Sequence, residues 1–305
     1  MKKHLQQLLL IAAMILVPWV TQGQAFTYSC DFDSDSDTAG WVYVNGSQTN
    51  QWVVGTATHN SGTKSLYVSN DGGTSNTYTK NTTTFCYAYQ EFSLAAGSYA
   101  LSYDWKAQGE SNYDYIRVFL APSTLTLSAG SSPSGGTSAY TWRNEALPTG
   151  CIGLHGPNHL NGQSSFQNFY TDLSITDSGT YRLVFAWAND GSGGSDPAGA
   201  IDNIIFSQPT CPRPLAVNYS NLTAHSFDIT WEEGGDATEW LIRLSDGSTV
   251  VSTYTTTDTL ESFTLLNSNT NYTVSVASIC GTGDTSLWRS LNILTIAIRW
   301  TRCPT

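Results

Sequence analysis

The chain has 305 residues with 24 acidic and 13 basic side chains, which give it a formal net charge of −11. Charged residues make up only 12% of the sequence, so hydroxyl and amide side chains supply most of its polarity. The acidic balance argues against nucleic acid and anionic membranes as partners, and the length is sufficient for two domains of ordinary size.

Residues 1–25 have the pattern of a secretory signal peptide. Lys2 and Lys3 precede an apolar stretch from Leu8 to Val20, and a polar segment then ends in Gly23-Gln24-Ala25. The apolar stretch is too short for a transmembrane helix, and no second run of roughly 18 apolar residues follows it. We therefore expect secretion, an extracellular or cell-surface location and no integral membrane insertion. Loss of this leader removes two basic and no acidic residues, which leaves a net charge of −13.

Beyond the leader, apolar and polar residues alternate in short runs that Gly, Asn and Asp interrupt. No stretch of a dozen residues has apolar positions at helical spacing, so the sequence predicts an all-β protein. The expected strands are, in chain order, Lys64–Val68, Phe92–Leu94, Tyr99–Trp105, Tyr115–Leu120, Tyr181–Trp187, Ile201–Phe206, Ser226–Trp231, Trp240–Leu244, Ser262–Leu265 and Tyr272–Ile279.

The proline-rich segment Gln208–Pro214 marks the expected domain boundary. Proline can extend neither a helix nor a central strand, so no regular element is expected to cross this segment. We therefore expect a first domain over residues 26–208, a second over residues 211–297 and an irregular tail over residues 298–305.

Each end of the first domain carries a short motif. It opens with Cys30-Asp31-Phe32-Asp33 and closes with Ala200-Ile201-Asp202-Asn203-Ile204. Its length is too great for an immunoglobulin-type sandwich and fits a two-sheet jelly roll. The motifs resemble the first and last strands of MAM-type jelly rolls. Ser102–Tyr115 resembles the central strand pair of surface modules from Bacteroidetes-type bacteria, including the jelly-roll adhesin regions attached to gingipain-like proteases.

The second domain resembles a fibronectin type III domain, which is an immunoglobulin-like sandwich. It opens with Cys211-Pro212-Arg213-Pro214 and continues through Trp231 to the run Leu266–Val276. The resemblance places Tyr272 at the corner between strands E and F, where the tyrosine hydroxyl hydrogen-bonds back across the turn. It also implies a module that displays or connects other parts of a protein.

The C-terminal segment departs from the usual last strand of such a domain. Ile293–Trp300 retains enough β-branched residues to form that strand, but Asn292–Thr305 lacks the expected Phe-x-Thr-like ending. We expect the chain to be a truncated or frame-shifted part of a longer surface protein. Sequencing the locus for a downstream jelly-roll reading frame tests this expectation.

The six cysteines of an exported chain are expected to form disulfides rather than to bind metal. The fibronectin resemblance places Cys211, at the start of strand A, and Cys280, at the end of strand F, at the same pole of the sandwich. A bridge between them is favoured, and two unpaired buried thiols are the alternative. The pairing of the other cysteines stays open: Cys30, Cys86, Cys151 and Cys303.

The MAM-like resemblance implies a structural calcium ion where the first and last strands meet, with Asp33 and Asp202 as ligands. Asp31, Asp33, Asp35 and Asp37 also alternate along the chain. An extended backbone would direct all four carboxylates to one side, where their repulsion favours a hard cation. The candidate calcium ligands are therefore Asp31, Asp33 and Asp202, and a solvated acidic turn is the alternative.

Exposed aromatic residues flanked by amides and carboxylates are the expected ligand-binding groups, because a ring face stacks on sugar C–H groups while polar neighbours bind hydroxyls. Trp142 and Tyr140, after the Gly/Ser-rich loop of residues 128–137, and Tyr113 with Asp114 are the candidates. A place in the core is the alternative for Trp142 and Tyr140. The tryptophans expected in the core are Trp41, Trp52, Trp105 and Trp187.

No motif for catalysis stands out. His155 and His159 have the spacing of zinc ligands on a helix, but the glycines and proline around them exclude that helix. We predict a non-catalytic extracellular or cell-surface module that binds a glycan or a host or matrix protein, with calcium as its one expected cofactor. The alternatives are a structural spacer or accessory region of a larger secreted enzyme, such as a protease or glycosidase, and a hydrolase with a spatially assembled site.

Overall fold

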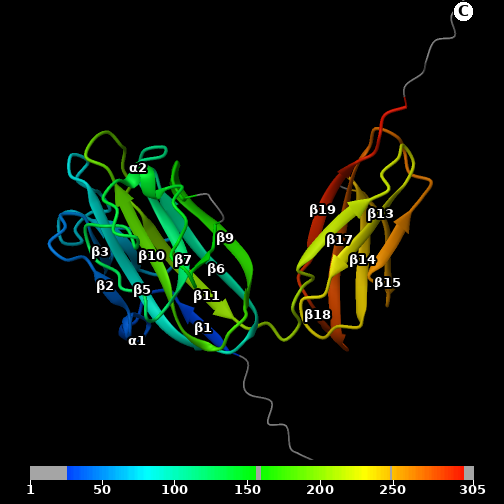
Figure 1. Cartoon of the computed structure of the whole chain (residues 1–305), viewed down its shortest axis with the longest axis horizontal. Helices are drawn as coiled ribbons and strands as arrows, with labels where there is room; N and C mark the ends of the chain where they lie inside the picture. The colour runs from blue at the N-terminus through cyan, green and yellow to red at the C-terminus, as the bar shows by residue number, and fades with distance from the viewer. Residues whose placement is uncertain (1–25, 156–158, 248, 299–305) are drawn as a thin grey trace, which may run out of the picture.

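A computed structural model describes residues 26–155, 159–247 and 249–298. The predicted signal peptide, most of the predicted tail and Cys303 lie outside these residues. Figure 1 shows two β-sandwiches connected by the segment around residues 208–214. The helices of the described residues are two short turns, α1 (Asp35–Thr38) and α2 (Ala139–Trp142), and no helix there is long and apolar enough to cross a membrane.

The first sandwich consists of two antiparallel sheets. Its strands are β1 (Thr27–Cys30), β2 (Val42–Val44), β3 (Gln51–Gly55), β4 (Ser65–Ser69), β5 (Thr84–Leu94), β6 (Gly97–Ala107), β7 (Tyr115–Pro122), β8 (Ile152–Gly153), β9 (Gln163–Ile175), β10 (Gly179–Asn189) and β11 (Ala200–Ser207). One sheet has the order β3-β4-β11-β6-β9, with β1 also paired to β11, and the other has the order β2-β5-β10-β7-β8. The predicted all-β, two-sheet sandwich is confirmed.

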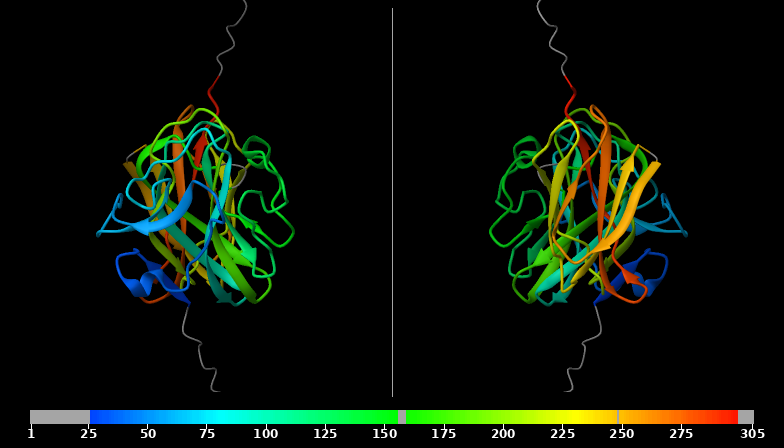
Figure 2. Two further views of the ribbon diagram at one scale, coloured as in Figure 1. Left: turned by 90° about the vertical axis from the view of Figure 1, so that its left-hand side faces the viewer. Right: turned by 90° about the vertical axis from the view of Figure 1, so that its right-hand side faces the viewer.

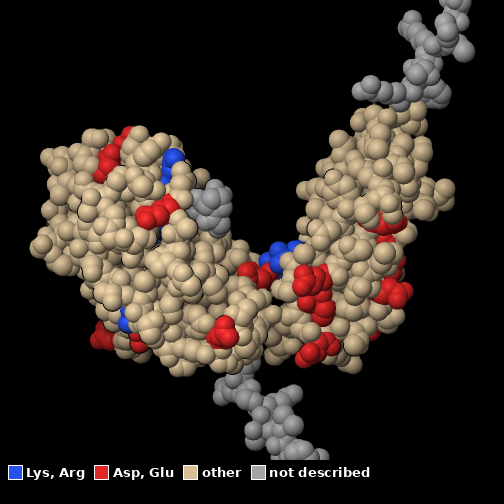
Figure 3. All heavy atoms as spheres, in the orientation of Figure 1, with Lys and Arg blue, Asp and Glu red and all other residues tan. Residues whose placement is uncertain are grey.

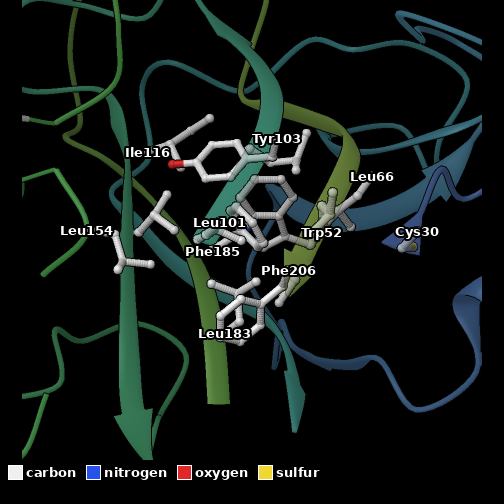
Figure 4. Close-up of a cluster of buried hydrophobic side chains, with 14 of the residues drawn as sticks. Cys30, Trp52, Leu66, Leu101, Tyr103, Ile116, Leu154, Leu183, Phe185 and Phe206 are labelled. Carbon is white, nitrogen blue, oxygen red and sulfur yellow. The ribbon is translucent and has the colours of Figure 1, made fainter. Parts of the chain in front are cut away.

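The main core lies between these two sheets. Trp52, Tyr103, Phe185 and Phe206 are buried and meet there (Figure 4). They come from strands whose residues alternate, so that every second side chain points to the same face of the sheet. All four tryptophans predicted for the core contact it. Trp41, Trp52 and Trp187 are buried, and Trp105 is half-buried.

Strand β7 is buried on both faces, and its neighbour β10 shares this property. Val118 and Leu120 belong to the main core, whereas Tyr115 and Phe119 point to the opposite face and are buried as well. The chain between β7 and β8, residues 123–151, covers that outer face and contains α2. The sheet and this segment enclose a second core, whose buried members are Phe85, Tyr87, Ala121, Leu127, Ala139, Trp142, Val184, Ala186 and Ala188 with the two β7 aromatics.

The second sandwich is smaller and also antiparallel. Its strands are β12 (Ala216–Ser220), β13 (Phe227–Glu232), β14 (Glu239–Asp246), β15 (Thr249–Thr256), β16 (Leu260–Phe263), β17 (Asn271–Gly281), β18 (Asp284–Thr285) and β19 (Arg289–Leu294). One sheet has the order β12-β13-β16, and the other has the order β15-β14-β17-β18 with β19 also paired to β17. The end-on views in Figure 2 show the two sandwiches one behind the other.

Two details predicted for the second domain are confirmed. The backbone N–H of Asn267 donates a hydrogen bond to the hydroxyl of Tyr272, with an N–O distance of 3.0 Å, which closes the expected corner. Cys211 and Cys280 form a disulfide across 69 residues, with their Cα atoms 5.5 Å apart. Among the described residues the remaining cysteines are unpaired: Cys30, Cys86 and Cys151.

The last strand lies earlier in the chain than predicted. β19 ends at Leu294, so it shares only residues 293–294 with the expected Ile293–Trp300. The cause is Thr295, which is buried and donates its backbone N–H to the carbonyl of Thr270 and its hydroxyl to the carbonyl of Asn267. These bonds tie the chain to the tyrosine corner and end its pairing with β17.

Asp172 on β9 joins the two sandwiches. Its carboxylate accepts hydrogen bonds from Arg213 in the connecting segment and from Nη2 of Arg289 on β19, the latter at 2.6 Å. The hydroxyl of Ser98 also donates to the carbonyl of Gly234 at 2.7 Å. Figure 3 shows basic atoms against acidic atoms where the two sandwiches approach each other.

Candidate functional site

Tyr113 and Tyr140 form an aromatic pair on the first sandwich. Their rings are stacked, with centroids 5.2 Å apart and planes 25° apart. The guanidinium carbon of Arg143 lies 4.9 Å from the centroid of the Tyr140 ring. Tyr140 is 51% exposed, and Tyr113 is half-buried. We call Tyr113, Tyr140 and Arg143 the tyrosine patch, and this is the part of the predicted ligand site that the structure brings together.

The geometry of the short turn α2 exposes Tyr140 to solvent and buries Ala139 and Trp142. The hydroxyl of Ser138 caps the turn by accepting a hydrogen bond from the N–H of Thr141 at 3.2 Å. Ala139 and Trp142, three residues apart, then share the buried face, while Tyr140 points to solvent. The sequence therefore needs only one helical turn to separate a core tryptophan from a surface tyrosine.

A second tight turn supplies Tyr113. The N–H groups of Tyr113 and Asp114 donate to the carbonyl of Glu110 at 3.1 and 3.0 Å. Asn112 has a φ of 74°, a left-handed conformation that asparagine tolerates better than most residues. The turn thus holds Tyr113 against α2, which is distant in the chain.

Trp142 lies in the core, so its ring face is not open to a ligand. It is 1% exposed and lies in the second core, with its ring centroid 5.6 Å from that of Phe85 and 6.0 Å from that of Tyr115. The guanidinium carbon of Arg117 lies 4.9 Å from its centroid. Of the two positions considered for Trp142, the core is correct. Trp142 thus anchors the helical turn α2, which also contains Tyr140 of the tyrosine patch.

Asp114 is also buried, which corrects its prediction as a ligand contact. It is 1% exposed, and its carboxylate accepts hydrogen bonds from the hydroxyl of Tyr78 at 2.5 Å and from the N–H of Asp190 at 3.2 Å. Burial raises the pKa of Asp114 to about 6, although these two hydrogen bonds oppose the increase. Gly194 packs so closely that a Cβ atom there would lie 2.3 Å from Asp114 Oδ2. The residue fixes the loop before β11 and has no access to a substrate.

The predicted calcium ligands bind backbone N–H groups instead of facing one another. Asp33 accepts from Thr63 and Lys64 at 2.7 and 2.8 Å, and Asp202 accepts from Asn60 and Ser61 at 2.7 and 3.2 Å. Both carboxylates therefore clamp the same loop, where the first and last strands meet. No group of three possible metal-ligating side chains occurs among the described residues. Calcium stays a prediction.

The alternating aspartates do not point to one side. Asp31 accepts from the N–H of Asp33 at 3.0 Å, but Asp35 and Asp37 lie in α1 rather than in an extended strand. Ser34 caps this turn, and the Asp37 carboxylate in return accepts from the Ser34 N–H at 3.2 Å. The predicted extended geometry is wrong because the Ser-x-x-Asp pattern forms a capping box.

The two histidines serve different aromatic contacts. His155 shares a hydrogen bond with Tyr103 and packs on Phe169, and burial lowers its pKa to about 4. The His159 ring centroid lies 4.7 Å from that of Tyr115 in the second core. They lie on opposite sides of the sheet that contains β7.

A pocket of ≈ 400 Å³ opens beside the tyrosine patch. Arg117 and Arg143 line it, together with Glu145 and Cys151. This pocket was not predicted from the sequence. The signal was present in β7 and β10, where nearly continuous apolar runs predict burial on both faces and therefore a covering segment with a rim.

No protein-family model matches the chain, and no curated protein matches it either. Among solved structures, the fn3 domain of human collagen alpha-1(XX) chain is 22% identical over 30% of this chain and 92% of its own length, with a TM-score of 0.28. The FN5 domain of Drosophila Lar is 14% identical over 29% of this chain and 99% of its own, with a TM-score of 0.24.

A third similar structure spans most of the chain. The Spr0440 glycoside hydrolase domain, Endo-D, from Streptococcus pneumoniae R6 is 13% identical over 83% of this chain, with a TM-score of 0.32. The chain covers 37% of the length of that hydrolase domain. At these scores the similarities carry no argument about activity, which has to come from the geometry of the site.

Proposed function

We propose that the chain is a secreted, non-catalytic binding module that holds a glycan on the tyrosine patch of its first sandwich. The observation that carries this proposal is the stacked pair of the exposed Tyr140 and the half-buried Tyr113. A tyrosine ring offers apolar surface to sugar C–H groups, and its hydroxyl offers a hydrogen bond to sugar hydroxyls.

The patch is held in place before any ligand arrives. Tyr140 packs against Tyr113 and Arg143, and Trp142 anchors the same helical turn in the second core. Ordering a side chain in advance reduces the entropy lost on binding.

Binding of the mature chain to a panel of immobilised neutral and acidic glycans tests this proposal. The substitution Tyr140→Ala is expected to weaken binding about tenfold or more, because an aromatic contact contributes on the order of 1 kcal/mol beyond the area it buries. Tyr219→Ala is the matched control, since Tyr219 is 50% exposed and lies on the second sandwich. Equal losses in both variants, or binding that neither variant changes, would show that the patch is not the site.

The spacer reading has its own supporting observation. Asp172 links both sandwiches through Arg213 and Arg289, so that the chain can hold attached parts at a defined separation. A spacer predicts that no glycan or extracellular protein binds and that Tyr140→Ala has no effect. Binding of a protein instead of a glycan, with loss in Tyr140→Ala, would keep the patch and change the class of ligand.

A further inference from the structure

Two arginines without acidic partners converge beside the tyrosine patch. Arg117 on β7 and Arg143 after α2 both line the pocket of ≈ 400 Å³. The four ion pairs of the described residues involve neither of them. His159 lies close enough to be affected by both charges. Burial is the main cause that lowers the pKa of His159, and the positive charges of Arg143 and Arg117 lower it further. The two guanidinium groups therefore share one neighbourhood.

Arg117 is fixed by the segment that covers the sheet. Its Nη1 donates to the carbonyl of Trp142 at 2.6 Å, and its Nη2 donates to the carbonyl of Glu145 at 2.8 Å. Its guanidinium carbon also lies over the Trp142 ring. These contacts hold the Arg117 guanidinium at the pocket wall. No carboxylate forms an ion pair with it among the described residues.

Arg143 retains unused donors. Its Nε atom is buried without a hydrogen-bond partner, and its guanidinium lies over Tyr140. No side-chain hydrogen bond of the described residues involves the terminal N–H groups of Arg143, so those groups remain for an acceptor delivered by a ligand. Because Arg143 belongs to the tyrosine patch and also lines the pocket, the two surfaces are continuous.

The charge of this pocket is unusual for the chain. Residues 26–208 contain six Lys and Arg residues. Besides Arg117 and Arg143 there are four, and two of these four form ion pairs: Arg182 with Glu91 and Lys80 with Asp196. Among the described residues that line the pocket, Glu145 is the single carboxylate, so the lining is cationic. Salt screens distant acidic residues beyond a Debye length of about 8 Å, so a local anion site can exist on an acidic protein.

We propose that this pocket binds the carboxylate of a uronic acid residue, in a glycan whose neighbouring sugar contacts the tyrosine patch. The inference rests on the proposed function and narrows its ligand to an acidic glycan. The planar guanidinium fork matches a carboxylate with two parallel hydrogen bonds, which favours this group over a neutral sugar.

Calorimetric titration of the mature chain with oligogalacturonides tests the inference. The matched probe is the same oligosaccharide with its carboxylates reduced to alcohols. The acidic form is expected to bind about tenfold more tightly or better, because hydrogen bonds to charged groups are the stronger ones. Arg143→Gln should abolish this preference, whereas Arg182→Gln, which removes a paired guanidinium elsewhere on the same domain, should retain it.

Cys151 provides a readout that needs no arginine variant. It lines the pocket and is partly exposed, whereas Cys30 and Cys86 are buried. In a Cys303→Ser background, the oligogalacturonide should slow the reaction of Cys151 with iodoacetamide, and the reduced probe should slow it less.

Each remaining outcome separates the two proposals. Equal affinity for the acidic and reduced probes, with loss in Tyr140→Ala, overturns the uronic acid inference and leaves glycan binding at the patch. Tighter binding of a sulfated galactan without uronic acid overturns the carboxylate assignment. Absence of binding to every probe overturns the inference, and failure of the whole glycan panel overturns the proposed function.

Discussion

Asp114 lies between the Tyr78 hydroxyl and the Asp190 N–H with almost no access to water. Its pKa, about 6 in the folded chain, is higher than the ordinary value of 3.8. The folded state therefore binds a proton that the unfolded state has already released in this range. Stability from this residue is greatest below about pH 4 and falls as the pH rises to about 6.

The variant Asp114→Asn removes this dependence, because an amide does not ionise and can still engage both neighbours. Relative to the wild type, the variant should gain up to about 3 kcal/mol between pH 4 and pH 6. Urea unfolding of both proteins at pH 4.5, 5.5 and 7 measures the difference. A difference that stays constant over this range would mean that Asp114 is not the titrating group.

Individual residues also differ in how well their place in the site could be predicted from the sequence. Tyr113 and Tyr140 were identifiable because aromatic residues follow turn-forming segments at both positions. The inward orientation of Trp142 depends on the cap at Ser138, and the burial of Asp114 depends on Tyr78, which is distant in sequence. Neighbours of this kind come from the tertiary fold, so residue type alone left Trp142 open between core and surface and assigned Asp114 to the surface wrongly.

At the scale of elements, the segment 123–151 converts an ordinary sheet face into a second core. Trp142 is its largest buried side chain, and it contacts aromatics of both β5 and β7. The variant Trp142→Ala should therefore destabilise the first sandwich by about 3–5 kcal/mol. Tyr140→Ala, two residues away but exposed, should change stability by less than about 1 kcal/mol.

Denaturant unfolding of both variants separates the two roles. A cost below about 1 kcal/mol for Trp142→Ala would show that segment 123–151 is not packed on the sheet. Loss of glycan binding in Tyr140→Ala at unchanged stability would then be attributable to the patch itself.

Several strands with a clear apolar face were predictable, and the edge strands β9 and β15 were not. β6, β7, β10 and β17 contain the expected runs because their inward residues are continuous. β9 has 13 residues, yet only Leu173 and Ile175 are buried. Its mostly polar sequence is therefore typical of a loop rather than of a strand. The exposed edge strand β15 was missed for the same reason.

At the scale of the whole molecule, the two sandwiches depend on Asp172 for their relative placement. Its carboxylate is largely buried and contacts two guanidinium groups of the second domain and its connecting segment. Relative motion is the ordinary expectation for two domains in one chain unless such contacts oppose it. Asp172→Ala should weaken the contact by about 2 kcal/mol, since it leaves two partly buried arginines without their partner.

Small-angle X-ray scattering of the mature chain checks this expectation. The variant should show a broader range of distances between the two sandwiches than the wild type. Asp177→Ala, which changes an exposed carboxylate in the turn after β9, is the matched control. Identical scattering from the Asp172 variant and the wild type would assign the arrangement to the connecting segment alone.

The claim that a glycan rests on the tyrosine patch is tested most directly by hydroxyl-radical footprinting of the unmodified mature chain. With the tightest-binding glycan of the panel at saturation, oxidation of Tyr140 should fall severalfold, while oxidation of the equally exposed Tyr219 stays the same. Unchanged oxidation of Tyr140, or protection confined to the second sandwich, would contradict the account.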